Sequence, residues 1–268
     1  MKIASTTLAA TLTVLLLPVL SACGGGNSGA TGIESQRPSY VRAAYSTDLL
    51  IYHGTATATG DAEAIESIAD DQGLSYRTVT SNELDAMSLD ELADHGAIVW
   101  PGGYAGQMSS SLDRATRDRL KQAVRERGVG FVGFCAGAFI AVSPSTSWGL
   151  SLVEQETLDY YHLEDEGVSY DMVDVQMPGG EASNLVWWGG PKLPEFSGGV
   201  IGRYTDTQEP AIAQTWAGNG LLVISGPHPE APTSWRSKLG LSDSDGLDQT
   251  IAADMILAAL RSDPMPSF

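Results

Sequence analysis

One cysteine stands in a setting that could perform covalent chemistry. Cys135 lies within Gly-Phe-Cys-Ala-Gly at residues 133–137, after an apolar run and before an apolar helical stretch. This G-x-C-x-G pattern is the cysteine form of the G-x-S-x-G turn, which places a nucleophile between a strand and a helix. Thiolate is the attacking form of cysteine, and N–H groups at a helix start stabilise negative charge. The pattern predicts a nucleophile at Cys135, and the alternative is a glycine-rich turn that holds a structural cysteine.

A thiol nucleophile needs a base, and the base needs a residue that orients it. His228-Pro229-Glu230 follows the apolar run at 221–225, so His228 is the candidate base and Glu230 the candidate orienting residue. A third short segment, Trp100-Pro101-Gly102-Gly103, also follows an apolar run. A histidine in a loop is usually a solvated or capping residue, so the prediction depends on the three segments meeting in space.

The pattern of apolar residues predicts the elements that would bring these segments together. Strands are expected at 48–52, 76–80, 97–100, 129–134 and 221–225, and helices at 61–72, 88–94, 111–127 and 247–261. Alternation of helices with strands that are apolar on both faces indicates a parallel sheet covered on each side. We therefore expect a three-layer, doubly wound, flavodoxin-like α/β fold with its site at the carboxyl ends of the strands. Residues 149–217 read as antiparallel strands, either within this fold or as an insertion.

Charge and composition restrict the partners. The 268 residues contain 15 Lys and Arg against 33 Asp and Glu, a formal net charge of −18, and no basic cluster. A nucleic-acid partner is therefore not expected. No His, Cys or Asp spacing matches a metal site, no phosphate loop is visible, and we expect no cofactor.

The amino end has the layout of an export signal. Residues 1–22 combine Lys2, a mostly apolar run and a small-residue ending. Leu-Ser-Ala-Cys at residues 20–23 resembles the lipobox of bacterial lipoproteins, which implies lipidation of Cys23; the alternative is an ordinary signal peptide. We expect a flexible tether over 23–46 and one domain over 47–262, anchored by lipid to the membrane of the bacterial cell envelope, outside the cytoplasm. Because Cys23 is the only other cysteine, lipidation would leave Cys135 without a disulfide partner.

The three motifs W-P-G-G, G-F-C-A-G and H-P-E together resemble the class I glutamine amidotransferase-like superfamily. Trp187-Trp188-Gly189-Gly190-Pro191 is similar to a motif of the amidotransferase-like domain at the amino end of some biotin-protein ligases. The superfamily resemblance implies that Cys135 is the nucleophile, His228 the base and Glu230 its orienting residue. It further implies oxyanion N–H groups from Gly103 and Ala136. The substrate-binding residues that we expect are Gly102, Trp187, Trp188, Gly189 and Gly190.

The resemblance implies hydrolysis or acyl transfer on a small amide or peptide substrate through a thioester on Cys135. Glutamine amidotransferases deliver ammonia to a synthetase, but we identify no synthetase partner for this chain, and no biotin-ligase catalytic domain. Two alternatives stay open. The chain could be an inactive module that binds a small ligand or peptide, or a redox-responsive protein that uses its thiol.

Overall fold

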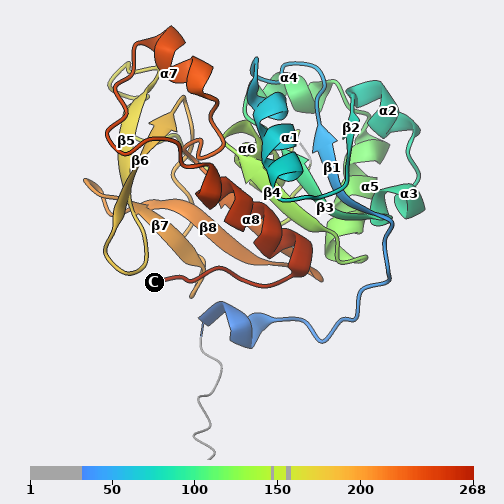
Figure 1. Cartoon of the computed structure of the whole chain (residues 1–268). Coiled ribbons are helices and arrows are strands. Elements are labelled where there is room, and N and C mark those ends of the chain that lie inside the picture. The colour runs from blue at the N-terminus through green and yellow to red at the C-terminus, as the bar shows by residue number, and fades with distance from the viewer. Residues whose placement is uncertain (1–31, 146–147, 155–157) are drawn as a thin grey trace, which may run out of the picture.

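The computed structural model describes residues 32–145, 148–154 and 158–268, and their centre is a single nine-stranded sheet (Figure 1). The strand order is β2-β1-β3-β4-β9-β8-β7-β5-β6. The first five strands in this order pair in parallel: β2 (Tyr76–Val79), β1 (Thr47–Tyr52), β3 (His95–Trp100), β4 (Gly130–Phe134) and β9 (Gly220–Ser225). The expected fold class, a three-layer α/β fold around a mostly parallel sheet, is confirmed.

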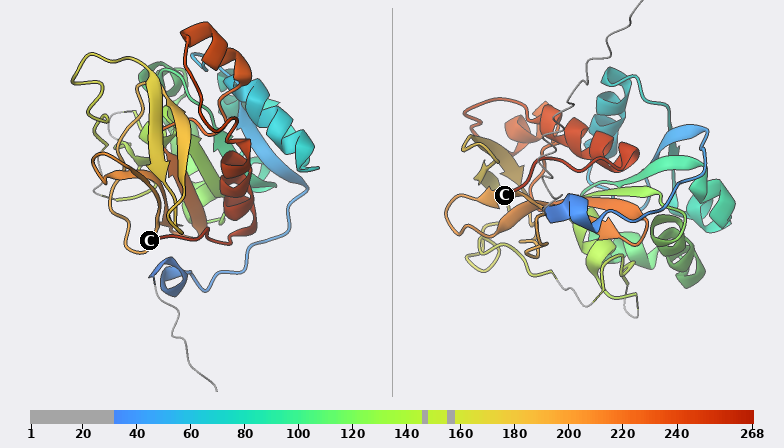
Figure 2. Two further views of the ribbon diagram at one scale, coloured as in Figure 1. Left: turned by 60° about the vertical axis from the view of Figure 1, so that its left-hand side comes forward. Right: turned by 90° about the horizontal axis from the view of Figure 1, so that it is seen from below.

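Helices cover both faces of the parallel half, as the view from below shows (Figure 2). In β1, Leu49 and Ile51 face the hydrophobic cluster that includes α1 and α8, whereas Leu50 and Tyr52 face the opposite cluster. Successive side chains of a strand point to opposite faces, so an apolar strand stabilises both layers. One face carries α1 (Asp61–Asp71) and α8 (Gln249–Arg261); the other carries α2 (Ser81–Ala86), α3 (Leu89–Ala93), α4 (Ala105–Ser110), α5 (Arg114–Arg125) and α6 (Ala136–Val142).

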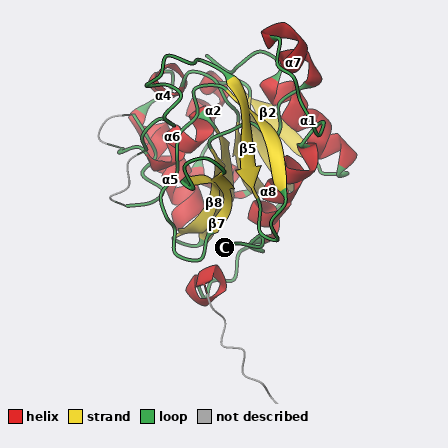
Figure 3. Ribbon diagram, turned by 90° about the vertical axis from the view of Figure 1, so that its left-hand side faces the viewer, coloured by secondary structure: helices red, strands yellow, loops and turns green. Residues whose placement is uncertain are grey.

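The antiparallel strands expected within residues 149–217 continue the same sheet. They are β8 (Pro210–Ala217), β7 (Val200–Tyr204), β5 (Asp171–Gln176) and β6 (Ala182–Trp187), and Figure 3 views the sheet from this end, with β5 towards the viewer. This half of the sheet curls back towards the central strands. The evidence is an isolated bridge between Val186 of β6 and His228, which follows β9. The outermost strand thereby returns to the carboxyl edge of the central strands.

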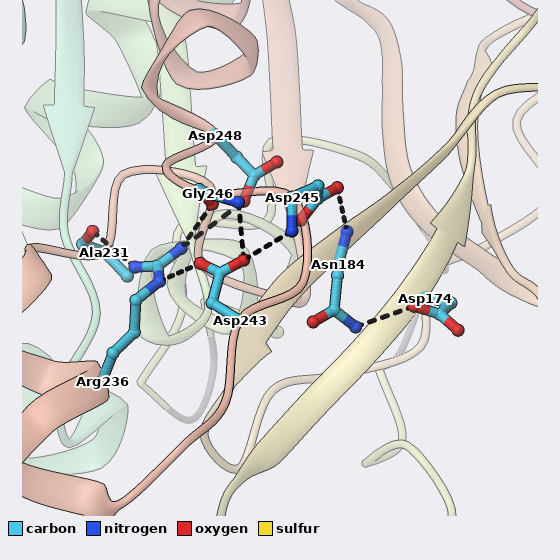
Figure 4. A network of polar contacts seen from close by, with 8 residues as sticks. All are labelled: Asp174, Asn184, Ala231, Arg236, Asp243, Asp245, Gly246 and Asp248. Atoms are coloured by element: carbon cyan, nitrogen blue, oxygen red, sulfur yellow. Dashed lines mark hydrogen bonds and ion pairs between the residues drawn. The ribbon is translucent and has the colours of Figure 1, made fainter.

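Three short helices were not expected from the sequence, namely α2, α4 and α7 (Thr233–Leu239). Each is too short to show helical periodicity over a useful window. α2 does carry a sequence signal, because Thr80 and Glu83 form a capping box. The chain after α7 is held by Arg236, which forms ion pairs with Asp243 and Asp248 and donates to the Ala231 carbonyl (Figure 4). This network fixes the segment that immediately follows Glu230.

The described chain begins within the segment expected to be a tether. A 3₁₀ helix, η1 (Gly32–Gln36), packs beside β8 with Ile33 buried, and the Trp216 indole N–H donates to the Ile33 carbonyl at 3.1 Å. Further along, the Arg42 guanidinium donates to the Gly96 carbonyl at 2.5 Å. Packed chain therefore extends back to Gly32. The expected signal peptide and Cys23 lie outside the described residues, and within the described ranges no helix is long and apolar enough to cross a bilayer.

Candidate active site

Cys135 occupies the turn between β4 and α6, where the G-x-C-x-G pattern predicts it. Its backbone has φ 46° and ψ −98°, a strained conformation that non-glycine residues seldom adopt and that is concentrated at functional sites. The Cys135 N–H donates to the Ser225 carbonyl of β9 at 2.8 Å, which ties the turn to the next strand. Gly137 permits the close approach of α6, because a Cβ there would collide with the Trp100 carbonyl oxygen.

The structure brings His228 and Cys135 into contact. The His228 N–H donates to the Val186 carbonyl at 2.7 Å, and the imidazole is 2% exposed. Cys135 and the Trp188 carbonyl both lie close enough to the His228 ring to raise its pKa. The Cys135 Sγ atom lies 3.4 Å from the same Trp188 oxygen. Residues from β4, β6 and the turn after β9 thus converge at one point.

Opposing effects act on the pKa of His228. Burial alone would lower this pKa, because it disfavours the imidazolium. The charge of Cys135 and its hydrogen bond to the ring, followed by the charge of Asp61 and the Trp188 carbonyl, outweigh burial, so the pKa of His228 is raised. The site therefore favours the protonated imidazole of His228.

Glu230 is placed to orient the base. The His228 Nδ1 and Glu230 Oε1 atoms are 2.7 Å apart, the distance of a strong hydrogen bond, and Glu230 is fully buried. Burial raises the pKa of Glu230 to about 8. With Nδ1–H directed at Glu230, the Nε2 atom is the ring nitrogen that remains for another partner.

Asp61 is a member of this cluster that the sequence patterns did not reveal. It is the first residue of α1, is fully buried, and accepts the Gly102 N–H at 2.5 Å. Potential ligand atoms of Asp61, His228 and Glu230 all lie within 4.8 Å of one another. These three groups could in principle hold a metal ion, although their sequence spacing gave no such signal. No motif predicts Asp61, because an acidic residue in the first turn is ordinary helix chemistry.

The two expected oxyanion donors have unengaged N–H groups. Ala136 is the first residue of α6 and Gly103 follows β3 by three positions. Among the described residues, neither N–H donates to another group. Gly102, expected to contact substrate, instead uses its N–H for Asp61 and leaves its Cα directly against the His228 ring. The Trp-Pro-Gly-Gly loop therefore contacts the His228 ring and also lies beside the turn that carries Cys135.

The residues expected to bind substrate fall into two groups. Trp187 is fully buried, and its indole N–H donates to the Gly190 carbonyl at 3.0 Å, which gives it a role in the core instead of on an open surface. Trp188 is partly exposed and its ring meets that of Trp235 at 5.1 Å. Gly189 has φ 62° and is partly exposed, whereas Gly190 is buried against Gly226. This close glycine contact holds the Trp188 carbonyl near the thiol.

Tyr160 also lies near the nucleophile and was not predicted. Its ring is 52% exposed and tilts against Phe139 of α6 at 5.0 Å between centroids. Burial, then Glu164 and Cys135, raise the pKa of Tyr160. The Tyr160 phenol is therefore close enough to Cys135 for an electrostatic interaction between them. A half-exposed aromatic ring at this position can contact a bound ligand.

Solved structures with this fold include glutamine amidotransferases. The chain is 14% identical to a glutamine amidotransferase from Methylobacillus flagellatus, with a TM-score of 0.50 over 84% of this chain and 98% of that one. PurLQS from Thermotoga maritima gives 14% identity and a TM-score of 0.51 over 81% and 99%. A further glutamine amidotransferase gives 20% identity and a TM-score of 0.49 over 72% and 97%. No protein-family model matches the sequence, and no curated protein matches it.

These similarities define the class of fold. The chain has a glutamine amidotransferase-like fold of class I, as the sequence resemblance implied.

Proposed function

We propose that this protein is a cysteine-dependent enzyme that hydrolyses an amide, or transfers its acyl group, through a thioester on Cys135. His228 acts as general base and acid, and Glu230 orients it. The amidotransferase-like fold supports the proposal because it supplies a strand-to-helix turn for the nucleophile. The observation that carries it is the position of the His228 imidazole, which lies 2.7 Å from Glu230 and near enough to Cys135 for that residue to raise its pKa.

The proposed reaction proceeds in two stages. The Cys135 thiolate attacks the amide carbon, and the oxyanion of the tetrahedral intermediate accepts hydrogen bonds from the Gly103 and Ala136 N–H groups. The His228 imidazolium gives its Nε2 proton to the leaving amine, the C–N bond breaks and a thioester remains. His228 then takes a proton from water, the hydroxide attacks the thioester, and the acid and the Cys135 thiolate are released.

Trapping of the thioester tests this proposal. Protein is incubated with a panel of small amides and N-acyl amino acids that includes glutamine, quenched in acid, and examined by intact mass spectrometry. We expect an acyl adduct on Cys135 and release of amine for at least one substrate. The Cys135→Ser variant should show no thioester and no turnover. Amine release that persists in Cys135→Ser would contradict the proposal.

A second candidate function is an inactive module that binds a small ligand or peptide on the amidotransferase-like shell. The observation that favours it is the burial of Cys135, which is 4% exposed with the Trp188 carbonyl 3.4 Å from its sulfur. A substrate must displace this cover before attack. Ligand binding measured by calorimetry in Cys135→Ser, without turnover of the same ligand by the parent protein, would establish this alternative.

We also propose that the protein is a lipoprotein, anchored through Cys23 on the outer side of a bacterial membrane. The support is the lipobox-like Leu-Ser-Ala-Cys sequence. Metabolic labelling with a palmitate analogue tests it, with Cys23→Ser as the matched control. Label that survives in Cys23→Ser would contradict it. A closer relation to the domain found in biotin-protein ligases stays a proposal, based on the Trp-Trp-Gly-Gly-Pro segment.

A further inference from the structure

Two buried carboxyl groups share one small site behind His228. Asp61 and Glu230 are each fully buried, although they come from opposite ends of the domain sequence. One oxygen of each is accounted for: Asp61 Oδ2 accepts the Gly102 N–H, and Glu230 Oε1 faces His228 Nδ1. The other oxygens, Asp61 Oδ1 and Glu230 Oε2, are buried and have no donor among the described residues.

A buried carboxylate oxygen without a donor is costly, and two such oxygens in one site repel each other. The titratable groups that face the pair are His228 and, beyond its ring, Cys135. Within the described chain, no Lys or Arg forms an ion pair with either carboxyl. A single imidazolium cannot neutralise two carboxylates. The least costly arrangement has one carboxyl protonated, with its O–H donated to the other.

We propose that Asp61 is a positioning residue of the active site, which holds a proton in a hydrogen bond between its carboxyl and that of Glu230. The inference deepens the proposed function and rests on it only in taking Glu230 as the residue that orients the base. Asp61 also accepts the Gly102 N–H, so this one side chain connects the orienting carboxyl to the loop that carries the Gly103 oxyanion donor.

The electrostatics agree with this geometry. Burial, and then the charge of Glu230, raise the pKa of Asp61 well above its usual range. Burial raises the pKa of Glu230 to about 8. The pKa values of Asp61 and Glu230 are thus both raised, as expected for two close carboxyls that share one proton at neutral pH. The proton is then a property of the pair and not of either residue.

A metal ion fits the same groups less well. Two ligand atoms bound to one tetrahedral zinc ion lie about 3.3 Å apart. The His228 Nδ1 and Glu230 Oε1 atoms are 2.7 Å apart, which is the distance of a hydrogen bond with a proton between them. A cation could bridge them only if this hydrogen bond broke and the base turned away from its orienting residue.

Infrared spectroscopy tests the proposal directly, because a protonated carboxyl and a carboxylate absorb at different frequencies. Spectra at pH 7 are recorded for the parent protein and for Asp61→Asn, whose amide N–H can replace the shared O–H. Asp248→Asn is the matched control, since Asp248 is another buried aspartate whose pKa is raised, to about 7. We expect a protonated-carboxyl band that Asp61→Asn loses and Asp248→Asn retains. A band unchanged in Asp61→Asn would overturn the proposal.

A second readout distinguishes positioning from mere support of the fold. The rate of Cys135 alkylation by iodoacetamide at pH 7 should fall about tenfold or more in Asp61→Ala, and Asp61→Asn should restore it to within about threefold of the parent. Equal losses in both variants would overturn the proposal, as would stoichiometric zinc that the parent protein binds and Asp61→Asn does not. The infrared band is measured in Cys135→Ser as well. If the protein hydrolyses no amide but the infrared band is present, the proposed function is wrong and the shared proton is still supported.

Discussion

His228 and Glu230 face each other across 2.7 Å in the interior, although only Pro229 separates them in the chain. The turn after β9 folds back so that the carboxylate reaches the Nδ1 side of the imidazole. Both side chains are buried, at 2% and 0% exposure, so water does not screen the interaction. The curled sheet and the β4–α6 turn bring Cys135 near the same imidazole, and in the proposed function its thiol is the nucleophile that this pair serves.

Replacement of Glu230 by glutamine separates two effects of this residue, the orientation of the His228 ring and the negative charge beside it. In Glu230→Gln, the new amide oxygen can still accept the His228 Nδ1–H, but the side chain carries no charge to stabilise the imidazolium. We expect kcat/KM for the amide identified by thioester trapping to fall about 10²- to 10⁴-fold, with the melting temperature largely kept. The control is Glu63→Gln on the exposed side of α1, which should leave kcat/KM unchanged. Full activity in Glu230→Gln would contradict the role given to Glu230.

The shared proton also predicts how stability depends on pH. The folded pKa of Glu230 is about 8 and its ordinary value is 4.5, so between these values the folded state binds more protons than the unfolded state. The contribution of Glu230 to stability is therefore greatest below about pH 4.5 and falls as pH rises towards 8, with a slope up to about 1.4 kcal/mol per pH unit. Urea denaturation at several pH values measures this slope.

Asp61→Asn provides the comparison for that slope. Asp248 titrates in the same range, since its pKa is about 7, so the parent profile alone does not identify the pair. Asp61→Asn removes the shared proton and should flatten the profile between pH 5 and 8. Asp248→Asn removes only the contribution of Asp248, so the slope up to pH 8 that Glu230 causes should remain in it. Identical profiles for the parent and Asp61→Asn would contradict a shared proton.

Gly137→Ala tests the close packing that supports the nucleophile turn. The added Cβ would collide with the backbone carbonyl of Trp100, and both segments are buried. We expect a loss of about 1–3 kcal/mol in the free energy of unfolding, together with slower alkylation of Cys135. Gly106→Ala in α4 is the matched control, because a Cβ there meets nothing within 4 Å. It should be neutral or stabilising by up to about 1 kcal/mol.

Arg236→Met tests the network that follows Glu230 (Figure 4). The variant leaves Asp243 and Asp248 without their guanidinium partner, in positions about one-tenth exposed. Breaking a buried pair on one side costs about 3–5 kcal/mol, which urea denaturation would measure. The exposed pair of Arg114 with Asp118 is the control, and Arg114→Met should cost under about 1 kcal/mol. Similar losses for the two variants would show that burial of the Arg236 network contributes little.

The sequence predicts the parallel half of the fold because its strands are apolar on both faces. β3 and β4 are completely buried, and each reads as a short apolar run that leads into a motif. The antiparallel half is harder to predict, because its register depends on pairing across long loops. No local pattern indicates that β6 curls back to His228. Trp187 and Trp188 were expected to bind substrate together, but Trp187 is the last residue of β6 and is fully buried, whereas Trp188 lies in the bend after the strand and is partly exposed.

The predicted nucleophile, base and orienting residue converge because each follows a central strand and parallel strands end at one edge. Asp61 could not be found in this way. It precedes no motif, and its importance depends on burial beside Glu230, which follows from the packing of α1 against the sheet. Tyr160 is similar, since its proximity to Cys135 depends on a loop and not on periodicity.

The central claim is that His228 holds Cys135 as a reactive thiolate, and the rate of alkylation at low pH tests it most directly. Intact mass spectrometry would follow iodoacetamide modification of Cys135 at pH 6, where an ordinary thiol is almost fully protonated. The account predicts that the parent protein reacts about tenfold faster or more than His228→Ala at this pH, with both variants folded. Equal rates at pH 6 would contradict it.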